Sequence, residues 1–253
     1  MTSQTRIELI GVPGLPLVAP GDDLAEMIAD ALEASALRPS TGDVLVVAHK
    51  IVSKAEDRCV ELATIKPSDR ALAIAAEIGK DPRLVEVVLA ESKRIVRKRP
   101  GLLIAEHRIG YVMANAGIDQ SNVGDGRVLL LPRDPDRSAE MLRKRSSERY
   151  GCEIAVIIND SFGRAWRRGT VGVALGAAGI PALIDLRGRA DLFGRKLQVT
   201  QVGFADEIAA AASLIMGQTA ERLPVVLARG IAWHDTPSPA QSLIRDEVED
   251  LFR

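Results

Sequence analysis

The sequence predicts an α+β fold arranged in two lobes. Hydrophobic residues make up 47% of the 253-residue chain, which is enough to bury a sizeable core. Helical and strand-like patterns both recur, but they do not alternate strictly as the βαβ units of a doubly wound sheet do. The stretch 106–135 has strand-like runs and turns without a helical pattern, and it separates two mixed halves. We therefore expect one domain over 5–253, with a soft boundary between its lobes within 106–135.

Helices are expected where capping signals bracket a helical hydrophobic period. Asp81 followed by Pro82 is typical of a helix start, because proline fits the first helical position. Gly151 is typical of a helix end, because glycine adopts the left-handed conformation of a C-terminal cap. The expected helices are 22–34, 68–78, 81–91, 136–150, 205–217 and an amphipathic tail helix over 238–252.

Strands are expected where short apolar runs are bounded by turn residues. The segment GTVGVALGAAGIPALIDL, residues 169–186, is the nearest approach to a membrane span. Its glycines, its proline and the charges at both ends favour a buried core segment instead. The expected strands are 44–47, 102–105, 111–114, 128–131, 154–158, 197–202 and 225–228.

Composition excludes several classes of protein. A formal net charge of −1 argues against a nucleic-acid binder, which needs a strong positive field. Aromatic residues make up only 3% of the chain, so a flat ligand must be held mainly by other means. The N-terminal residues lack a secretory signal, and we expect a cytoplasmic protein without a membrane partner. Cys59 and Cys152 lack the spacing of a zinc or redox site, and we expect two reduced, buried thiols.

The most informative segment is VIINDSFGRAWRRG, residues 156–169. A buried strand ends there in Asp160 and Ser161, and arginines follow at Arg164, Arg167 and Arg168. A carboxylate at the end of a rigid strand is well placed to bind a divalent cation, and arginine suits phosphate. The alternative is a turn in which Asp160 caps backbone amides and the arginines are solvated, and this segment alone does not decide between the two.

The second segment is NAGIDQSNVGDG, residues 115–126, in which Asp119 follows a strand-like run. Turn chemistry explains most of its residues. Asp119 and Asp160 would nevertheless make a natural pair for Mg²⁺ or Mn²⁺, which use one or two carboxylates together with substrate phosphates. The sequence does not place the two side chains together.

The third segment is VVAHKIVSKAEDR, residues 46–58, in which a strand runs out into His49, Lys50, Ser53 and Lys54. Lysines there can reach phosphate oxygens, although solvated lysines are commoner. The basic runs 92–100 and 187–196 are also more often solvated faces. No GxxxxGK[ST] motif exists, so a P-loop is excluded, and the glycines of 169–186 are spaced wrongly for a dinucleotide fingerprint.

These segments together, with IGVPGLPLVAPGDDL, GRADLFGRKLQVT and ADEIAAAASLIMGQ in the same order, resemble the coenzyme F420:L-glutamate ligase family over nearly the whole chain. The resemblance implies a GTP-dependent amide ligase that adds L-glutamate to coenzyme F420-0 and extends a γ-linked polyglutamate tail through an acyl phosphate. It also implies an unusual α+β fold of two intertwined subdomains, a nucleotide site without a P-loop, and a homodimer.

The resemblance also implies the site residues. The metal ligands fall on Asp119, Asp160 and the Ser161 hydroxyl, for two divalent ions, Mg²⁺ or Mn²⁺, with K⁺ as a further candidate. Arg164 and Arg168 are candidate contacts for phosphate or for the tail. Gln218 stands where some relatives have Glu, so its role as a ligand stays open. The guanine-nucleotide contacts fall on Leu15, Pro16, Leu17, Val18, His49, Lys54 and Asn122.

Two other functions remain open on the sequence motifs. The same acidic pair would serve a metal-dependent phosphohydrolase. A non-catalytic binding protein for the deazaflavin coenzyme is the second alternative, against which the paired carboxylates argue, because a binder needs no metal site.

Overall fold

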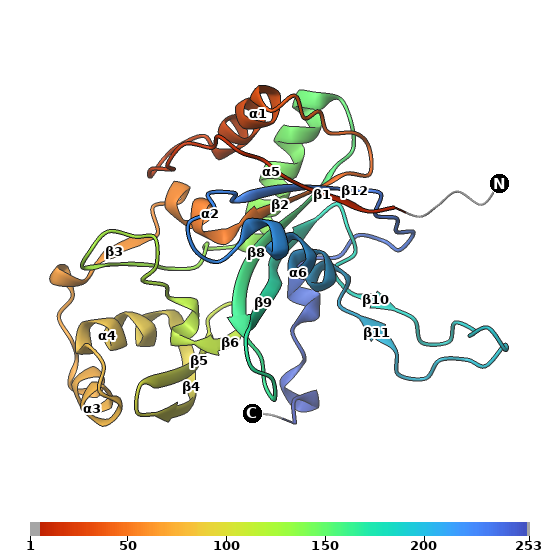
Figure 1. Cartoon of the computed structure of the whole chain (residues 1–253). Helices are drawn as coiled ribbons and strands as arrows, with labels where there is room; N and C mark the ends of the chain where they lie inside the picture. Colours follow the sequence, from red (N-terminus) through yellow and green to blue (C-terminus); the bar gives the residue numbers. More distant parts are fainter. Residues whose placement is uncertain (1–5, 252–253) are drawn as a thin grey trace.

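A computed structural model describes residues 6–251, and their fold is α+β, as the sequence predicts (Figure 1). In this part of the chain the largest sheet has five strands in the order β1-β12-β2-β8-β9. Strands β2 and β8 run parallel, and the other neighbours in this sheet are antiparallel. The strands are β1 (Glu8–Gly11), β2 (Val44–Ala48), β8 (Ala155–Gly163), β9 (Thr170–Ala178) and β12 (Val225–Arg229).

Both faces of the large sheet are buried, so its central strands are continuously hydrophobic. Alternate residues of β2 face opposite sides: Leu45 and Val47 belong to one core cluster, and Val44 and Val46 belong to the other. Helices α1 (Leu24–Ala34), α2 (His49–Ala55) and α5 (Pro135–Tyr150) cover the first side, and α6 (Phe204–Met216) covers the second.

A smaller lobe lies beside this sheet (Figure 1). Its core contains Ile78, Leu84, Leu103 and Val128 from several elements. The boundary within 106–135 stays a prediction. The elements of the lobe are η1 (Leu62–Thr64), α3 (Asp69–Ile78), α4 (Pro82–Glu91), η2 (Asn115–Gly117), a three-stranded sheet of β4 (Ser92–Arg99), β5 (Leu102–His107) and β6 (Val112–Ala114), and the pair β3 (Cys59–Glu61) and β7 (Arg127–Leu129).

A long hairpin projects from the body between β10 (Ile184–Asp185) and β11 (Gln201–Val202) (Figure 1). We call residues 186–200 the arm. The strand expected over 197–202 is therefore wrong except at its end, because residues 197–200 belong to the arm. Leu192, Phe193 and Val199 of the arm are 100%, 96% and 85% exposed.

The helix expected over 238–252 is also wrong. The described part of this segment contains two short 3-10 turns, η3 (Ala240–Leu243) and η4 (Glu247–Glu249). Asp136 accepts hydrogen bonds from the amides of Ala240 and Gln241, which ties the segment to α5. Ala240, Leu243 and Ile244 pack against the body, but Val248 is 94% exposed, so the apolar residues are not buried as the continuous stripe of one helix.

Other sequence expectations are confirmed. Residues 169–186 lie mostly in buried β9 and its continuation, and among the described residues no helix is long and apolar enough to cross a membrane. Cys59 and Cys152 are free thiols as expected, but both are only partly buried, so their expected burial is not confirmed. The basic run 92–100 contains strand β4, and its Lys and Arg side chains are exposed, as a solvated face requires.

Candidate active site

The parallel pairing of β2 and β8 brings two sequence segments together at one edge of the sheet. Ala48, the last residue of β2, is in register with Asn159, so His49 and Asp160 follow side by side. The Nε2 atom of His49 lies 3.2 Å from Oδ1 of Asp160. The His49 side chain is 2% exposed and the Asp160 side chain is 13% exposed, so both lie at the inner end of the site.

A β-bulge lies immediately before Asp160. Ile158 is in register with Gly176 and Asn159 with Ala174, which leaves an extra residue on β9. Asn159 faces α6, where its Nδ2 donates to Ser213 Oγ over 3.0 Å. Asp160 therefore points to the opposite side of the strand, toward α2.

Asp119 is held by a short bridge to β7. Its amide donates to the Leu129 carbonyl over 3.0 Å, and its carbonyl accepts from the Leu129 amide over 2.8 Å. The turn before it is left-handed at Asn115, Ala116 and Gly117, whose φ angles are 52°, 51° and 75°. Glycine is required at 117, because a Cβ there would lie 2.5 Å from the Met113 sulfur.

Helix α2 contacts both carboxylate segments: His49 lies against Asp160, and the lysines reach the loop of Asp119. Lys50 and Lys54 are one helical turn apart, so both reach the same loop. Lys50 Nζ lies 2.8 Å from Asp119 Oδ2 and donates to Ser121 Oγ over 2.5 Å. Lys54 Nζ donates to the Asn122 carbonyl over 3.0 Å. The resemblance did not single out Lys50, although its spacing from Lys54 was the signal that could have found it.

Both carboxylates are held in the ionised form. Burial raises the pKa of Asp119, but the hydrogen bond from Lys50 and the Ser121 amide outweigh it, and the pKa lies below its ordinary value. Burial also raises the pKa of Asp160, but the His49 imidazole lowers it by more, so the pKa of Asp160 lies below its ordinary value. The negative charge of Asp119 raises the pKa of Asp160, so the two carboxylates are close enough to repel each other. Such a pair attracts a cation.

Ser161 and Gln218 extend the oxygen-rich surface beside Asp160. The Ser161 hydroxyl donates to Gln218 Oε1 over 2.7 Å. Gln218 arrives there because α6 ends at Met216 and Gly217 turns the chain with φ of 69°. Within residues 6–251 no three His, Cys, Asp or Glu side chains form a metal-binding group. Two carboxylates with a hydroxyl and an amide oxygen nevertheless fit Mg²⁺ or Mn²⁺, which prefer oxygen and retain waters.

The expected nucleotide contacts fall into two groups. Lys54 and Asn122 are bonded to each other, and His49 is buried against Asp160. The loop containing residues 15–18 packs into the same core as α2, because Leu15 and Val18 share a core cluster with Ile51 and Val52 of that helix. Pro16 and Leu17 are exposed on this loop.

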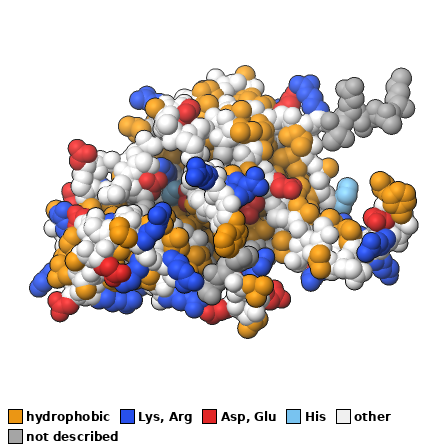
Figure 2. Space-filling model, turned by 60° about the horizontal axis from the view of Figure 1, so that its bottom comes forward, with side chains coloured by type: hydrophobic (Ala, Val, Ile, Leu, Met, Phe, Trp, Pro, Cys, Tyr) orange, Lys and Arg blue, Asp and Glu red, His pale blue; other side chains and the backbone are white. Residues whose placement is uncertain are grey.

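The arginines expected to contact phosphate are not part of this cluster. Arg164, Arg167 and Arg168 lie in the exposed turn between β8 and β9, where Arg164 Nη1 donates to the Gly169 carbonyl at 3.5 Å. The basic strand β4 is partly neutralised, since Lys93 and Arg94 pair with Glu106, and Lys98 pairs with Glu77. Figure 2 shows Lys and Arg side chains gathered on the side of the smaller lobe, among acidic ones.

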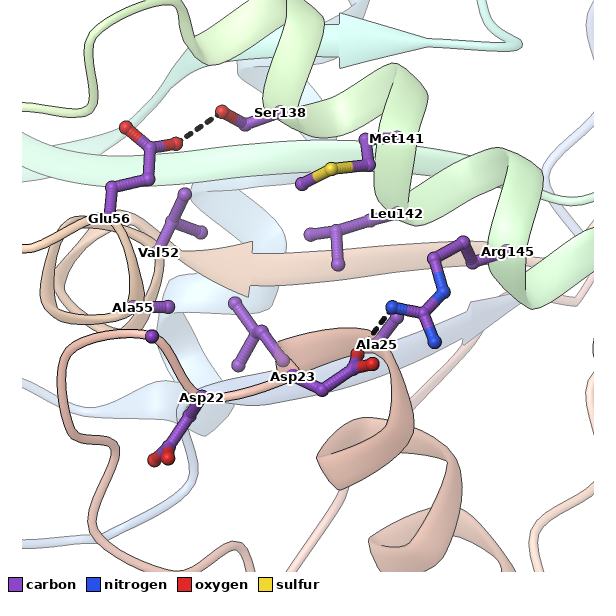
Figure 3. Close-up of a pocket in the computed structure, with 12 residues that line it drawn as sticks. Asp22, Asp23, Ala25, Val52, Ala55, Glu56, Ser138, Met141, Leu142 and Arg145 are labelled. Carbon is purple, nitrogen blue, oxygen red and sulfur yellow. Dashed lines mark hydrogen bonds and ion pairs between the residues drawn. The ribbon is translucent and has the colours of Figure 1, made fainter.

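A separate hollow of about 280 Å³ lies at the other end of α2 (Figure 3). Val52, Ala55 and Leu142 form its apolar wall. Its carboxylates bond to neighbouring side chains: Glu56 accepts from Ser138 over 2.5 Å, and Asp23 pairs with Arg145 at 2.5 Å. Neither Asp119 nor Asp160 lines this hollow, so it is distinct from the carboxylate site.

Comparison with known proteins gives a consistent result. The family model described as F420-0:Gamma-glutamyl ligase matches residues 14–230. The coenzyme F420:L-glutamate ligase of Methanothermobacter thermautotrophicus is 49% identical, over 98% of this chain and 99% of its own. The proteins of the same name from Methanopyrus kandleri and Archaeoglobus fulgidus are 48% and 47% identical, over 93% and 98% of this chain and 93% and 97% of theirs.

Proposed function

The chain belongs to the F420-0:gamma-glutamyl ligase family, and from this premise we propose that it is the ligase that joins L-glutamate to coenzyme F420-0 by an amide bond. The observation that carries the proposal is the sequence identity of 49% and 47% to two ligases of that name, over almost the full length of both chains. The buried and oppositely charged groups around Asp119 and Asp160 support a polar reaction at that edge of the sheet.

We propose GTP as the source of energy. A carboxylate is a poor electrophile, so its oxygen first attacks the γ-phosphorus of GTP, and GDP leaves. The α-amine of L-glutamate then attacks the acyl phosphate, a C–N bond replaces the C–O bond, and inorganic phosphate and a proton depart. Repeating the reaction on the γ-carboxylate of the added residue extends the tail.

The residues of the site can be given roles in this reaction. Lys54 and Asn122 would hold the nucleotide, with the loop over residues 15–18 beside them. Lys50 lies on Asp119 and would steady phosphate oxygens as a point charge. Asp119, Asp160 and the Ser161 hydroxyl would bind two divalent cations, with Gln218 within reach of the hydroxyl. Bound Mg²⁺ or Mn²⁺ offsets the charge that builds up on the transferred phosphoryl group.

We further propose that the protein is a homodimer, and that the arm of one copy binds the other copy. The exposed Leu192 and Phe193 at the end of the arm support this proposal. Large apolar side chains grouped on a projecting hairpin are typical of a surface that is covered in an assembly. The partners are then a second copy, GTP, L-glutamate and the coenzyme in its successive glutamylated forms.

The activity is tested by incubating the protein with GTP, Mn²⁺, L-glutamate and coenzyme F420-0 and measuring product masses. We expect a ladder spaced by one glutamyl residue, and no product when GTP is omitted. Phosphate release from GTP should require both the coenzyme and glutamate. Release without them would favour a metal-dependent phosphohydrolase and overturn the ligase proposal.

The metal assignment is tested by Asp160→Asn. Asparagine keeps the volume and an acceptor for the Ser161 amide, but it removes the charge that a divalent cation requires. We expect product to fall below detection while the thermal unfolding temperature changes little. Wild-type turnover by this variant, measured by product mass, would contradict the role of Asp160.

A further inference from the structure

His49 is the first residue of α2, yet its side chain points into the protein. Only 2% of the side chain is exposed, and its Nε2 atom lies 3.2 Å from Asp160 Oδ1. The resemblance assigned this position to the nucleotide. An imidazole buried to this extent offers little surface to a ligand, so its contact with Asp160 needs its own explanation.

The hydrogen bonding of His49 is one-sided. Its Nδ1 atom is buried and has no hydrogen-bond partner among the described residues. The Ser53 hydroxyl, one turn further along the same side of α2, is likewise buried and without a partner there. The polar interaction that fixes the imidazole is therefore the one with Asp160.

The Asp160 carboxylate is held through a single oxygen. Oδ1 accepts from the Ser161 amide over 2.6 Å, and His49 Nε2 lies 3.2 Å from the same oxygen. Two donors on one oxygen fix the plane of the carboxylate. Within residues 6–251 no hydrogen bond or ion pair is made by the other oxygen, Oδ2. This carboxylate is thus oriented and retains a free oxygen for a cation.

We propose that His49 is a positioning residue, which donates from Nε2 to hold Asp160 ready to bind a divalent cation, and that it is not a contact of the nucleotide. The inference rests on the metal site of the proposed function. Carboxylates that bind metals are commonly oriented by a hydrogen-bond donor behind them, and loss of such a donor weakens metal binding by about 10- to 100-fold.

The test compares variants of His49 by their affinity for Mn²⁺ alone, measured without nucleotide from the free-ion electron paramagnetic resonance signal. His49→Leu keeps an apolar volume and removes the donor, and His49→Asn keeps an amide that is too short to reach Asp160. His49→Gln places an amide donor near the position of Nε2. Ser53→Ala is the matched control, because it removes a buried polar atom from the same side of α2 without touching Asp160.

We expect His49→Leu and His49→Asn to bind Mn²⁺ about 10-fold or more weakly. His49→Gln should restore most of the affinity, and Ser53→Ala should match the wild type. Binding of a fluorescent GTP analogue in the absence of metal should be unchanged in all of them. If His49→Leu does not fold, the comparison of His49→Asn with His49→Gln decides, and equal Mn²⁺ affinity in that pair overturns the inference.

Two further results are separated by the same measurements. If His49→Gln or His49→Asn binds the GTP analogue more weakly while its Mn²⁺ affinity is intact, His49 is a nucleotide contact, and its positioning role is overturned. Wild-type Mn²⁺ affinity in Asp160→Asn would overturn the metal site itself, and with it the inference. Weakened binding in Asp160→Asn but not in His49→Asn would overturn the role of His49 alone.

Discussion

Glu91 is a single carboxylate that connects the two lobes. Arg58 Nη2 lies 2.6 Å from its Oε2, and His107 Nε2 lies 3.4 Å from the same oxygen. Arg58 also donates through Nε to the Leu131 carbonyl over 2.9 Å. The adjacent His107 imidazole lowers the pKa of Glu91; burial opposes it, and the nearby Arg58 charge lowers the pKa further. The ionised carboxylate is thus part of the native structure.

Replacing Glu91 with Gln should destabilise the protein at pH 7 by about 3 kcal/mol, because it leaves the Arg58 charge largely buried and unpaired. Since the folded pKa of Glu91 is depressed, its stabilising effect is present above the unfolded pKa of about 4.3 and is lost as pH falls through the folded pKa. Urea unfolding at pH 7 and pH 3 should therefore show a difference between wild type and variant that shrinks in acid.

The matched control is Glu77→Gln, which removes an ion pair with Lys98 in which the Glu77 side chain is 55% exposed. Exposed pairs contribute about 0–1 kcal/mol, so this variant should unfold nearly as the wild type does. A Glu91→Gln penalty that is the same at both pH values would contradict the linkage argument.

At this scale the sequence predicted which residue types matter but not which of them meet. Asp119 and Asp160 were singled out as polar residues that follow strand patterns, and their metal role stays a prediction. The helix that starts at His49 could not be seen, because it is only seven residues long and its N-cap, Ala48, has no capping side chain. Without that helix, the spacing that carries Lys50 to Asp119 is not apparent.

Strand β9 approaches helices α6 and α5 closely because a glycine gives room to each. A Cβ on Gly172 would lie 2.3 Å from the Ala209 carbonyl oxygen of α6. A Cβ on Gly176 would lie 2.2 Å from the Pro135 carbonyl oxygen at the start of α5. Both obstacles are backbone atoms, so a larger residue would displace a whole helix rather than a side chain.

Gly172→Ala should therefore destabilise the protein by about 2–3 kcal/mol, because α6 must move away from the sheet. Movement of α6 also shifts Gln218 from Ser161, so turnover should fall together with the unfolding temperature. Gly163→Ala is the control, since a Cβ at Gly163 meets no atom within 4 Å. If the two variants unfold at similar temperatures, the close approach of β9 to α6 does not limit the size of the residue at position 172.

Elements with local signals were predictable, and elements made by tertiary contacts were not. Helices α3, α4 and α5 begin after Ser68, Asp81 and Asp134, whose side chains accept from helical amides as capping rules require. The amphipathic period of the tail predicts a helix, but in the structure Asp136 binds its amides, and Ala240, Leu243 and Ile244 pack against the body from short turns. Long-range hydrogen bonds of this kind leave no mark in the local sequence.

The arm is the feature that governs assembly of the whole molecule. Changing both Leu192 and Phe193 to Asp should convert the proposed homodimer to a monomer, because buried charges without partners are strongly unfavourable at an interface. Sedimentation at micromolar concentration measures the mass directly. Leu72→Asp, at a 48% exposed apolar position on α3, is the control for adding a surface charge and should leave the dimer intact. A monomeric wild type would contradict the proposed assembly.

The parallel pairing of β2 with β8 also has a consequence for how the molecule folds. Its two strands come from distant parts of the sequence, and Gln218 arrives from still further along. Contacts of high sequence separation form slowly, because a long loop must close before they are made. During synthesis, α2 and its lysines emerge well before Asp160 exists to meet them. The edge of the sheet at Asp160 is therefore expected to be among the last parts to form on the ribosome, and a prematurely terminated chain would contain most of the helices but not this assembled group of side chains.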